Sequence, residues 1–362
     1  MPSLPDRRPV TLLSGVSPES LAATMVSLLW DRPRSVAVQH HLDVDAQRLT
    51  RTVSDAQSVV ERVEVDLEHA CVSCAVTEDV VPTLVRLAAS GRWDCVIAHL
   101  PVGAPAAAVC HLLETDADAA RVVRVASVLA CVEGSAVVDD LLGDDLLRER
   151  GLASSADDSR GVGEVACAQV EHADHVVVTG PVQDGGADLL AALRRPGVPV
   201  VLGPERLPGD LLVRHDHHHA ATLGWVDLHR DVVAPHGSGR AWTRDLVSDR
   251  AFHPERLLLH LDRLGGGRHR SRGWFWLPTR PGRRLAWDGS GGQLSVGDHG
   301  TWGRGGPRTR LLLTGVGTPP DHLEQAFEDL LVGPADSAGT TPWAGRSGDG
   351  FEPWLGPVRR VA

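Results

Sequence analysis

The sequence contains no lysine, no asparagine and no tyrosine, so all 36 of its Lys and Arg residues are arginine. A P-loop neutralises the β- and γ-phosphates of a nucleotide with a lysine, and an Asn-Lys-x-Asp motif recognises guanine. The broad, planar guanidinium of arginine does not fit where the compact ammonium of that lysine sits. These absences therefore exclude the usual P-loop apparatus of phosphoryl transfer.

Positive charge is also in short supply. The 362 residues include 36 Lys and Arg against 47 Asp and Glu, which gives a formal net charge of −11. This balance excludes a protein that coats nucleic acid by bulk electrostatics, although a local arginine cluster still suits contact with RNA. The sequence shows neither a signal-peptide pattern nor an apolar run of transmembrane length, so we expect a cytoplasmic protein without a membrane partner.

The length predicts two domains, and 42% hydrophobic residues suffice for packed cores. In the first domain, apolar segments typical of buried strands alternate with helical segments, which predicts a doubly wound α/β fold around a parallel sheet. Residues 40–60 are expected to form a polar connection. The expected strands are 9–14, 35–39, 63–67, 95–100, 122–130, 174–179 and 198–202.

A smaller α+β domain is expected to follow. Its helices would pack on one face of a mainly antiparallel sheet that includes the arginine-rich and aromatic strand 272–277. The boundaries that we predict are a first domain at 1–210, a histidine-rich linker at 211–222, the second domain at 223–333 and a disordered tail at 334–362.

Two of the six cysteines are close enough to act together. Cys71 and Cys74 form a Cys-x-x-Cys turn, in which two thiolates reach one soft metal at ~2.3 Å, and His69 stands two residues earlier as a third ligand. We predict a weak, exchangeable zinc site at these three residues. An inert metal-free pair and a redox pair remain alternatives. The other cysteines are interpreted as small, buried hydrophobic residues: Cys95, Cys110, Cys131 and Cys167.

A histidine-rich segment runs from His215 to His219. Tracts of this composition bind metal ions as flexible, multidentate loops. Because no fixed spacing supports a defined coordination geometry, we favour an exposed polar linker and keep metal binding as the alternative.

Arginines are interleaved with Trp274, Phe275 and Trp276 in a chain that is otherwise acidic. This composition is typical of surfaces that contact RNA through phosphate forks and base stacking. A β-hairpin with core aromatics and solvated arginines explains the same pattern, because alternate residues of a strand point to opposite faces. We favour the hairpin. The arginines concerned are Arg268, Arg270, Arg272, Arg280, Arg283 and Arg284.

Four segments match, in order, the landmarks of one known family: Thr11–Gly15, Cys71–Cys74, Arg250–Leu257 and Arg272–Pro281. They resemble the CobW family of P-loop GTPases and metallochaperones. Thr11–Gly15 looks like the family's first strand and first P-loop glycine, and Cys71–Cys74 resembles its Cys-x-Cys-Cys metal motif. The strongest similarity lies in Arg250–Leu257 and Arg272–Pro281, which resemble the family's C-terminal domain. The resemblance implies a P-loop-like first domain, a CobW C-terminal domain and zinc as the metal.

The departures from that family fall on its nucleotide chemistry. In register with the P-loop, Leu21 stands in place of the phosphate lysine and Ala22 in place of the Mg²⁺-binding hydroxyl, while Thr179–Val182 replaces the guanine-reading motif. We therefore expect a degenerate P-loop, in which Gly15 is the remaining cofactor-binding position. GTP and Mg²⁺ are not expected as cofactors, and the protein is not expected to be an active GTPase.

The chain also resembles, more narrowly, actinobacterial CobW-like proteins that recruit a ribosome-hibernation factor during zinc starvation. The degenerate P-loop and the His-x-Cys-Val-Ser-Cys element from His69 to Cys74 carry this similarity. It implies that the partners are the small ribosomal subunit and a hibernation-promoting factor. The arginine and aromatic composition of the Arg268–Arg284 hairpin would suit a contact with rRNA in such an assembly. The alternatives are a zinc metallochaperone with residual nucleotide binding and a metal-binding regulator that does not contact the ribosome.

Overall fold

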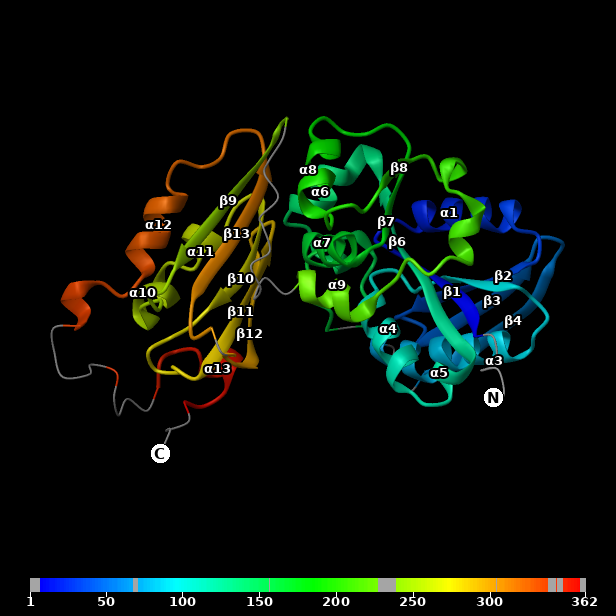
Figure 1. Cartoon of the computed structure of the whole chain (residues 1–362), viewed down its shortest axis with the longest axis horizontal. Helices are drawn as coiled ribbons and strands as arrows, with labels where there is room; N and C mark the ends of the chain where they lie inside the picture. The colour runs from blue at the N-terminus through cyan, green and yellow to red at the C-terminus, as the bar shows by residue number, and fades with distance from the viewer. Residues whose placement is uncertain are drawn as a thin grey trace.

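The computed structural model of the chain describes residues 7–67, 71–155, 157–226, 239–303, 305–337, 343 and 348–358. They form two units, each built on its own sheet (Figure 1). The first is an eight-stranded sheet in the order β4-β3-β2-β5-β1-β6-β7-β8. Its strands are β1 (Arg8–Gly15), β2 (Ser35–Asp43), β3 (Arg48–Asp55), β4 (Val59–Asp66), β5 (Cys95–His99), β6 (Val123–Glu133), β7 (His175–Thr179) and β8 (Val200–Leu202).

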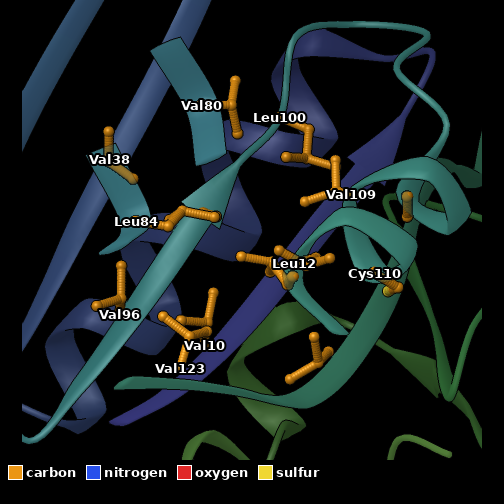
Figure 2. Packing of buried hydrophobic residues seen from close by; sticks show 14 of the residues in the cluster. Val10, Leu12, Val38, Val80, Leu84, Val96, Leu100, Val109, Cys110 and Val123 are labelled. Atoms are coloured by element: carbon orange, nitrogen blue, oxygen red, sulfur yellow. The ribbon is translucent and has the colours of Figure 1, made fainter. Parts of the chain in front are cut away.

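Helices cover both faces of this sheet, which confirms the predicted doubly wound α/β fold. Successive side chains of β1 alternate between two cores: Leu12 packs with α3 and α4 on one face, and Leu13 packs with α1 on the other. Figure 2 shows Leu12 among Leu84, Val109 and the neighbouring side chains of the first core. The helices are α1 (Pro18–Asp31), α2 (Val72–Ala75), α3 (Val81–Ala89), α4 (Ala106–Thr115), α5 (Ala119–Val122), α6 (Val137–Leu142), α7 (Val162–His172), α8 (Gly186–Leu193) and α9 (His219–Val226).

The sheet is not parallel throughout. The segment expected to be a polar connection prolongs β2 to Asp43 and forms β3, and β3 pairs antiparallel with both β2 and β4. Sequence reasoning missed this hairpin because β3 and β4 lie at the sheet edge, where most of their side chains are only partly buried and therefore polar.

The second unit is a five-stranded antiparallel sheet in the order β12-β11-β10-β13-β9, and it confirms the expected smaller α+β domain. Its own helices cover one face, and the first unit lies against the other through α6, α7 and α8 (Figure 1). The strands are β9 (Ala241–Ser248), β10 (His269–Phe275), β11 (Arg283–Ser290), β12 (Gln293–Thr301) and β13 (Thr309–Val316); the helices are α10 (Pro254–Leu259), α11 (Asp262–Gly265), α12 (Leu323–Leu330) and α13 (Glu352–Leu355).

The arginines of β10 face the first unit rather than solvent. Phe275 points into the aromatic core of the second unit, whereas Arg270 and Arg272 belong to the alternate set of side chains and are buried. Arg270 donates to both carboxylate oxygens of Glu171 on α7, at 2.8 and 2.9 Å. The expectation of solvated arginines is therefore wrong for these two residues, because a second layer of protein covers this face of the sheet.

Part of the tail is ordered, and the predicted disorder is wrong for residues 348–358. Phe351 is fully buried in the second core, and Asp349 accepts hydrogen bonds from the buried Arg280 at 2.8 and 3.1 Å. One aromatic anchor and one buried ion pair thus hold a glycine-rich and proline-rich segment whose composition by itself favours disorder. Among the described residues, none of the helices combines the length and apolar character needed to cross a membrane.

We expect Phe351→Ala to destabilise the second unit by about 3–5 kcal/mol, because it removes a fully buried ring and leaves a cavity. Urea unfolding measures the change. The matched control is Trp354→Ala in the same segment, whose side chain is 57% exposed and whose loss should cost less than about 0.5 kcal/mol. Equal unfolding curves for the Phe351 variant and the wild type would show that the segment does not contribute to the core.

Candidate metal centre

Four buried side chains that are far apart in the sequence converge at one point of the first unit. They are Cys110, His172, His217 and His219, and their potential ligand atoms all lie within 4.8 Å of one another. Within the described parts of the chain, this is the one group of three or more such side chains that could share an ion. A thiol and three imidazoles in contact form a ready-made coordination set for a transition metal.

Three helices bring these residues together. Cys110 lies on the buried face of α4, next to Val109 at the edge of the apolar core (Figure 2). His172 is the last residue of α7, and His219 is the first residue of α9, with His217 two residues before it. Because α9 lies beside α4 and α7 (Figure 1), the end of α7 and the beginning of α9 come together next to Cys110.

The imidazoles of this cluster are not satisfied by the protein. Both ring nitrogens of His172, both of His219 and Nε2 of His217 are buried without a hydrogen-bond partner. Each buried polar group left without a partner costs about 1–3 kcal/mol, and native proteins contain few of them. Because an ion coordinates one nitrogen of each ring, a metal bound at this point would supply partners for three of these five atoms, one on each histidine.

Asp174 orients one of the histidines. Its Oδ2 lies 2.9 Å from Nδ1 of His217 and also accepts the backbone N–H of Val128 at 2.8 Å, while Arg195 donates to its other oxygen. A histidine that donates Nδ1–H to a carboxylate keeps the lone pair of Nε2 for a metal ion. Carboxylate–histidine pairs of this kind are characteristic of the outer shell of zinc sites.

Burial keeps the histidines in the form that a metal requires. It lowers the pKa of His172 to about 3, with the neighbouring His217 as the next cause, and it lowers the pKa of His219. Both rings are therefore neutral near pH 7, with free lone pairs. Burial raises the pKa of the Cys110 thiol well above its usual value, so binding of the ion must itself displace the thiol proton.

The donor set fits zinc. One cysteine and three histidines satisfy the tetrahedral coordination of Zn²⁺, with Zn–S near ~2.3 Å and Zn–N near ~2.0 Å. Ligand atoms in such a site lie about 3.5 Å apart, so small side-chain movements bring the present cluster to that geometry. Four protein ligands close the coordination sphere, as in sites that hold a metal rather than use it to activate water.

The Cys-x-x-Cys pair lies outside this cluster. Cys71 caps α2, its Sγ accepting the backbone N–H of Cys74 at 3.0 Å, and both cysteines are free and half-buried. The hydrogen bond to Cys71, followed by burial, raises the pKa of the Cys74 thiol. His69 lies outside the described residues. The predicted ligation by His69, Cys71 and Cys74 therefore stays a prediction.

The end of β1 is tightly packed. A Cβ added at Gly15 would lie 2.5 Å from the carbonyl oxygen of Cys131 on β6, so only glycine fits this approach of two backbones. The first turn of α1 is also already capped, since Ser17 accepts the backbone N–H of Ser20 at 3.2 Å and Pro18 has no N–H to offer. The predicted cofactor contact at Gly15 stays a prediction.

A hydroxyl–carboxylate network lies at the carboxyl ends of β6 and β7. The hydroxyl oxygens of Ser20 and Thr179 are 2.5 Å apart, and both contact Glu133 Oε2, at 3.5 and 3.1 Å. In doubly wound folds this edge of the sheet is where ligands bind. Here the edge presents a carboxylate, which repels phosphate.

The expectation of an exposed histidine linker is wrong for His217 and His219, which are buried. Cys110 is buried as expected, but it belongs to the ligand cluster. Sequence reasoning missed the site because its members come from three separate segments without a motif spacing. The available signal was the histidine tract itself, together with His172 and Asp174 at the junction between a helix and the following strand.

Comparisons with known proteins bear on the family. Residues 242–331 match the model of the cobalamin synthesis protein cobW C-terminal domain. Over 313 residues, 82% of this chain and 74% of the relative, the sequence is 28% identical to the zinc chaperone Rv0106 of Mycobacterium tuberculosis and to the uncharacterized protein Mb0109 of Mycobacterium bovis. The solved Zn(II)-bound YjiA GTPase from E. coli is 14% identical with a TM-score of 0.32, over 90% of this chain and 99% of that chain.

We expect Cys110→Ser and His172→Ala each to weaken zinc binding by about 100-fold or more, because each removes one of four ligands from a closed site. Competition with a chromophoric chelator measures the affinity, and elemental analysis measures the stoichiometry. Cys131→Ser is the matched control, since Cys131 is also a buried thiol but contributes to no ligand cluster. Unchanged zinc affinity in both ligand variants would refute the assignment.

Proposed function

The chain carries a CobW C-terminal domain and is thereby related to the CobW family; on that premise we propose that it is a zinc-binding protein whose ion is held by Cys110, His172, His217 and His219. One observation carries this proposal: among the described residues, three buried histidines that each have a ring nitrogen without a hydrogen-bond partner converge beside a thiol. The name of the mycobacterial relative, a zinc chaperone, supports the same metal.

The finer proposal is that the protein acts as a zinc-responsive adaptor with a degenerate P-loop. Leu21 and Ala22 replace the residues that hold phosphate and Mg²⁺, α1 is capped by its own Ser17, and Glu133 occupies the sheet edge. These features disfavour GTP hydrolysis. As an adaptor, the protein would recruit a ribosome-hibernation factor to the small ribosomal subunit, as the narrower sequence resemblance implies.

The alternative is a zinc metallochaperone that retains some nucleotide binding. The two proposals share the zinc site and differ in the use of GTP. The rRNA contact proposed for the Arg268–Arg284 hairpin concerns the adaptor alone. Much of that positive charge is paired within the protein: Arg268 with Asp139, Arg280 with Asp349 and Arg283 with Asp298.

For the adaptor, we expect no measurable binding of GTP in the presence of Mg²⁺ by isothermal titration calorimetry. The physical reason is the carboxylate of Glu133 at the sheet edge and the lack of a phosphate-binding cation in the loop. Glu133→Gln is the informative variant, because it removes the negative charge while keeping hydrogen-bonding capacity toward Ser20 and Thr179. Clear GTP binding by the wild type would favour the chaperone.

Ribosome association tests the adaptor directly. We expect the wild type to co-sediment with small subunits from zinc-starved cells and to do so less from zinc-replete cells. Cys110→Ser/His172→Ala should lose this zinc dependence, and Cys71→Ser/Cys74→Ser reports separately on the second thiol pair. Absence of the protein from ribosomal fractions under both conditions would eliminate the adaptor and leave the metallochaperone.

A further inference from the structure

Within the described part of the chain, a buried arginine at the boundary of the two units, Arg272, has no carboxylate oxygen nearer than 3.5 Å. Arg272 on β10 is buried, and its Nε lies 3.5 Å from Glu171 Oε1. That carboxylate already accepts two shorter hydrogen bonds, at 2.8 and 2.9 Å, from Arg270. Burial lowers the pKa of Arg272, because its neighbouring carboxylates do not fully offset the loss of hydration of the charged guanidinium.

Helix α9 covers this arginine. The indole of Trp225 stacks on the guanidinium, with 4.5 Å from the Arg272 Cζ to the ring centroid, and the Val226 carbonyl accepts a long hydrogen bond of 3.5 Å from Arg272 Nη1. Both contacts come from the last turn of α9. Stacking on an indole partly replaces the water that Arg272 lacks.

The same helix forms one wall of a cavity of about 670 Å³ between the units. Residues of α9 line it on one side, and Arg272, Arg284, Trp274 and His299 line it on the other. Arginine beside aromatic rings is the combination with which proteins bind phosphate and stack nucleic-acid bases. Two carboxylates also line the cavity, Glu171 and Asp288, and both are ion-paired with Arg270. The rest of the wall therefore suits an anionic, base-bearing ligand.

Few apolar contacts hold α9 in place. Its buried residues are His219 and Thr222, both polar, whereas Leu223 is 42% exposed and Gly224 weakens the helix from within. His219, the first residue of the helix, belongs to the metal cluster, as does His217 two residues before it. The beginning of α9 therefore carries potential metal ligands, and its end carries Trp225 and Val226, which contact Arg272.

We propose that zinc bound at Cys110, His172, His217 and His219 holds α9 over Arg272, and that loss of zinc releases α9 and exposes a phosphate-binding surface for single-stranded RNA. The inference rests on the zinc-binding function proposed above. Without the ion, three unsatisfied imidazoles draw water into the site, and α9 has too little apolar burial to stay attached. RNA is favoured over an acidic peptide because tryptophan and histidine rings accompany the arginines.

The first test is hydrogen exchange of the full chain, with zinc and after chelation. Peptides from α9 should exchange much faster in the zinc-free protein, by about tenfold or more in protection, while those from β1 stay protected. Elemental analysis of the same samples reports zinc content. If zinc binds to these residues and the exchange of α9 is the same in both states, the inference is overturned and the zinc-binding function stands. If the wild-type protein contains no zinc in the zinc-treated sample, the proposed zinc-binding function is refuted instead.

The second test is fluorescence anisotropy of a labelled, short single-stranded oligoribonucleotide at low salt. The chelated protein should bind at least about tenfold more tightly than the zinc-loaded protein, with an affinity that falls as salt rises. Arg272→Gln should remove the gain, and Arg308→Gln, which changes an exposed arginine of the same unit, should keep it. Equal RNA binding in both zinc states, or preference for an acidic peptide, would overturn the inference.

Loss of RNA binding by Arg272→Gln would also result from misfolding, so a second variant is needed that is expected to gain binding. Trp225→Ala keeps all four zinc ligands but removes the ring that covers Arg272. It should bind zinc with unchanged affinity and bind the oligoribonucleotide even when zinc-loaded. If the zinc-loaded Trp225 variant has a native circular dichroism spectrum but does not bind the oligoribonucleotide, α9 does not block RNA binding and the inference is overturned.

Discussion

The buried ion pair between Glu171 and Arg270 is the constraint on which the arrangement of the two units depends. Both side chains are almost inaccessible, and Glu171 uses both of its oxygens on the one guanidinium. Removing one partner of such a pair costs about 3–5 kcal/mol, because the other charge stays buried alone. The last turn of α7 is therefore fixed to β10. The residue after Glu171 is His172, so the same turn also presents a metal ligand.

This adjacency joins metal binding to the contact between the units. Two sets of contacts connect the ligand cluster with β10. The first runs from His172 to the adjacent Glu171 and its ion pair with Arg270, and the second runs along α9 from His219 to Trp225, which stacks on Arg272. The first set is rigid because it ends in a buried, bidentate pair. The second is weak because α9 has little apolar burial. Under the proposal above, loss of the metal therefore loosens the attachment of α9 to β10, while the ion pair between Glu171 and Arg270 keeps the two units together.

The candidate ligand site of this chain lies in the helical layer rather than at the edge of the sheet. Doubly wound folds bind their ligands where the strands end, and here that edge holds Glu133 with Ser20 and Thr179 hydrogen-bonded to it. Between α4, α7 and α9, by contrast, the described residues place five buried ring nitrogens without a hydrogen-bond partner, on His172, His217 and His219. Unpartnered buried nitrogens are a more specific guide to a ligand site than the position of a fold's usual cleft, because each one carries a desolvation cost that must be offset.

The sequence by itself determined the α/β and α+β units, since strand and helix periodicity is local and apolar burial follows it. It also determined that no lysine-based phosphate chemistry is present. Only the tertiary structure decided three features: the histidine and cysteine cluster, the burial of Arg270 and Arg272, and the order in residues 348–358. Cys110, His172 and His219 become neighbours only when three helices pack, and Arg270 is buried only because a second unit covers its sheet. Contacts between distant segments leave no periodic trace in a sequence, whereas their energies depend on burial, which the whole fold creates.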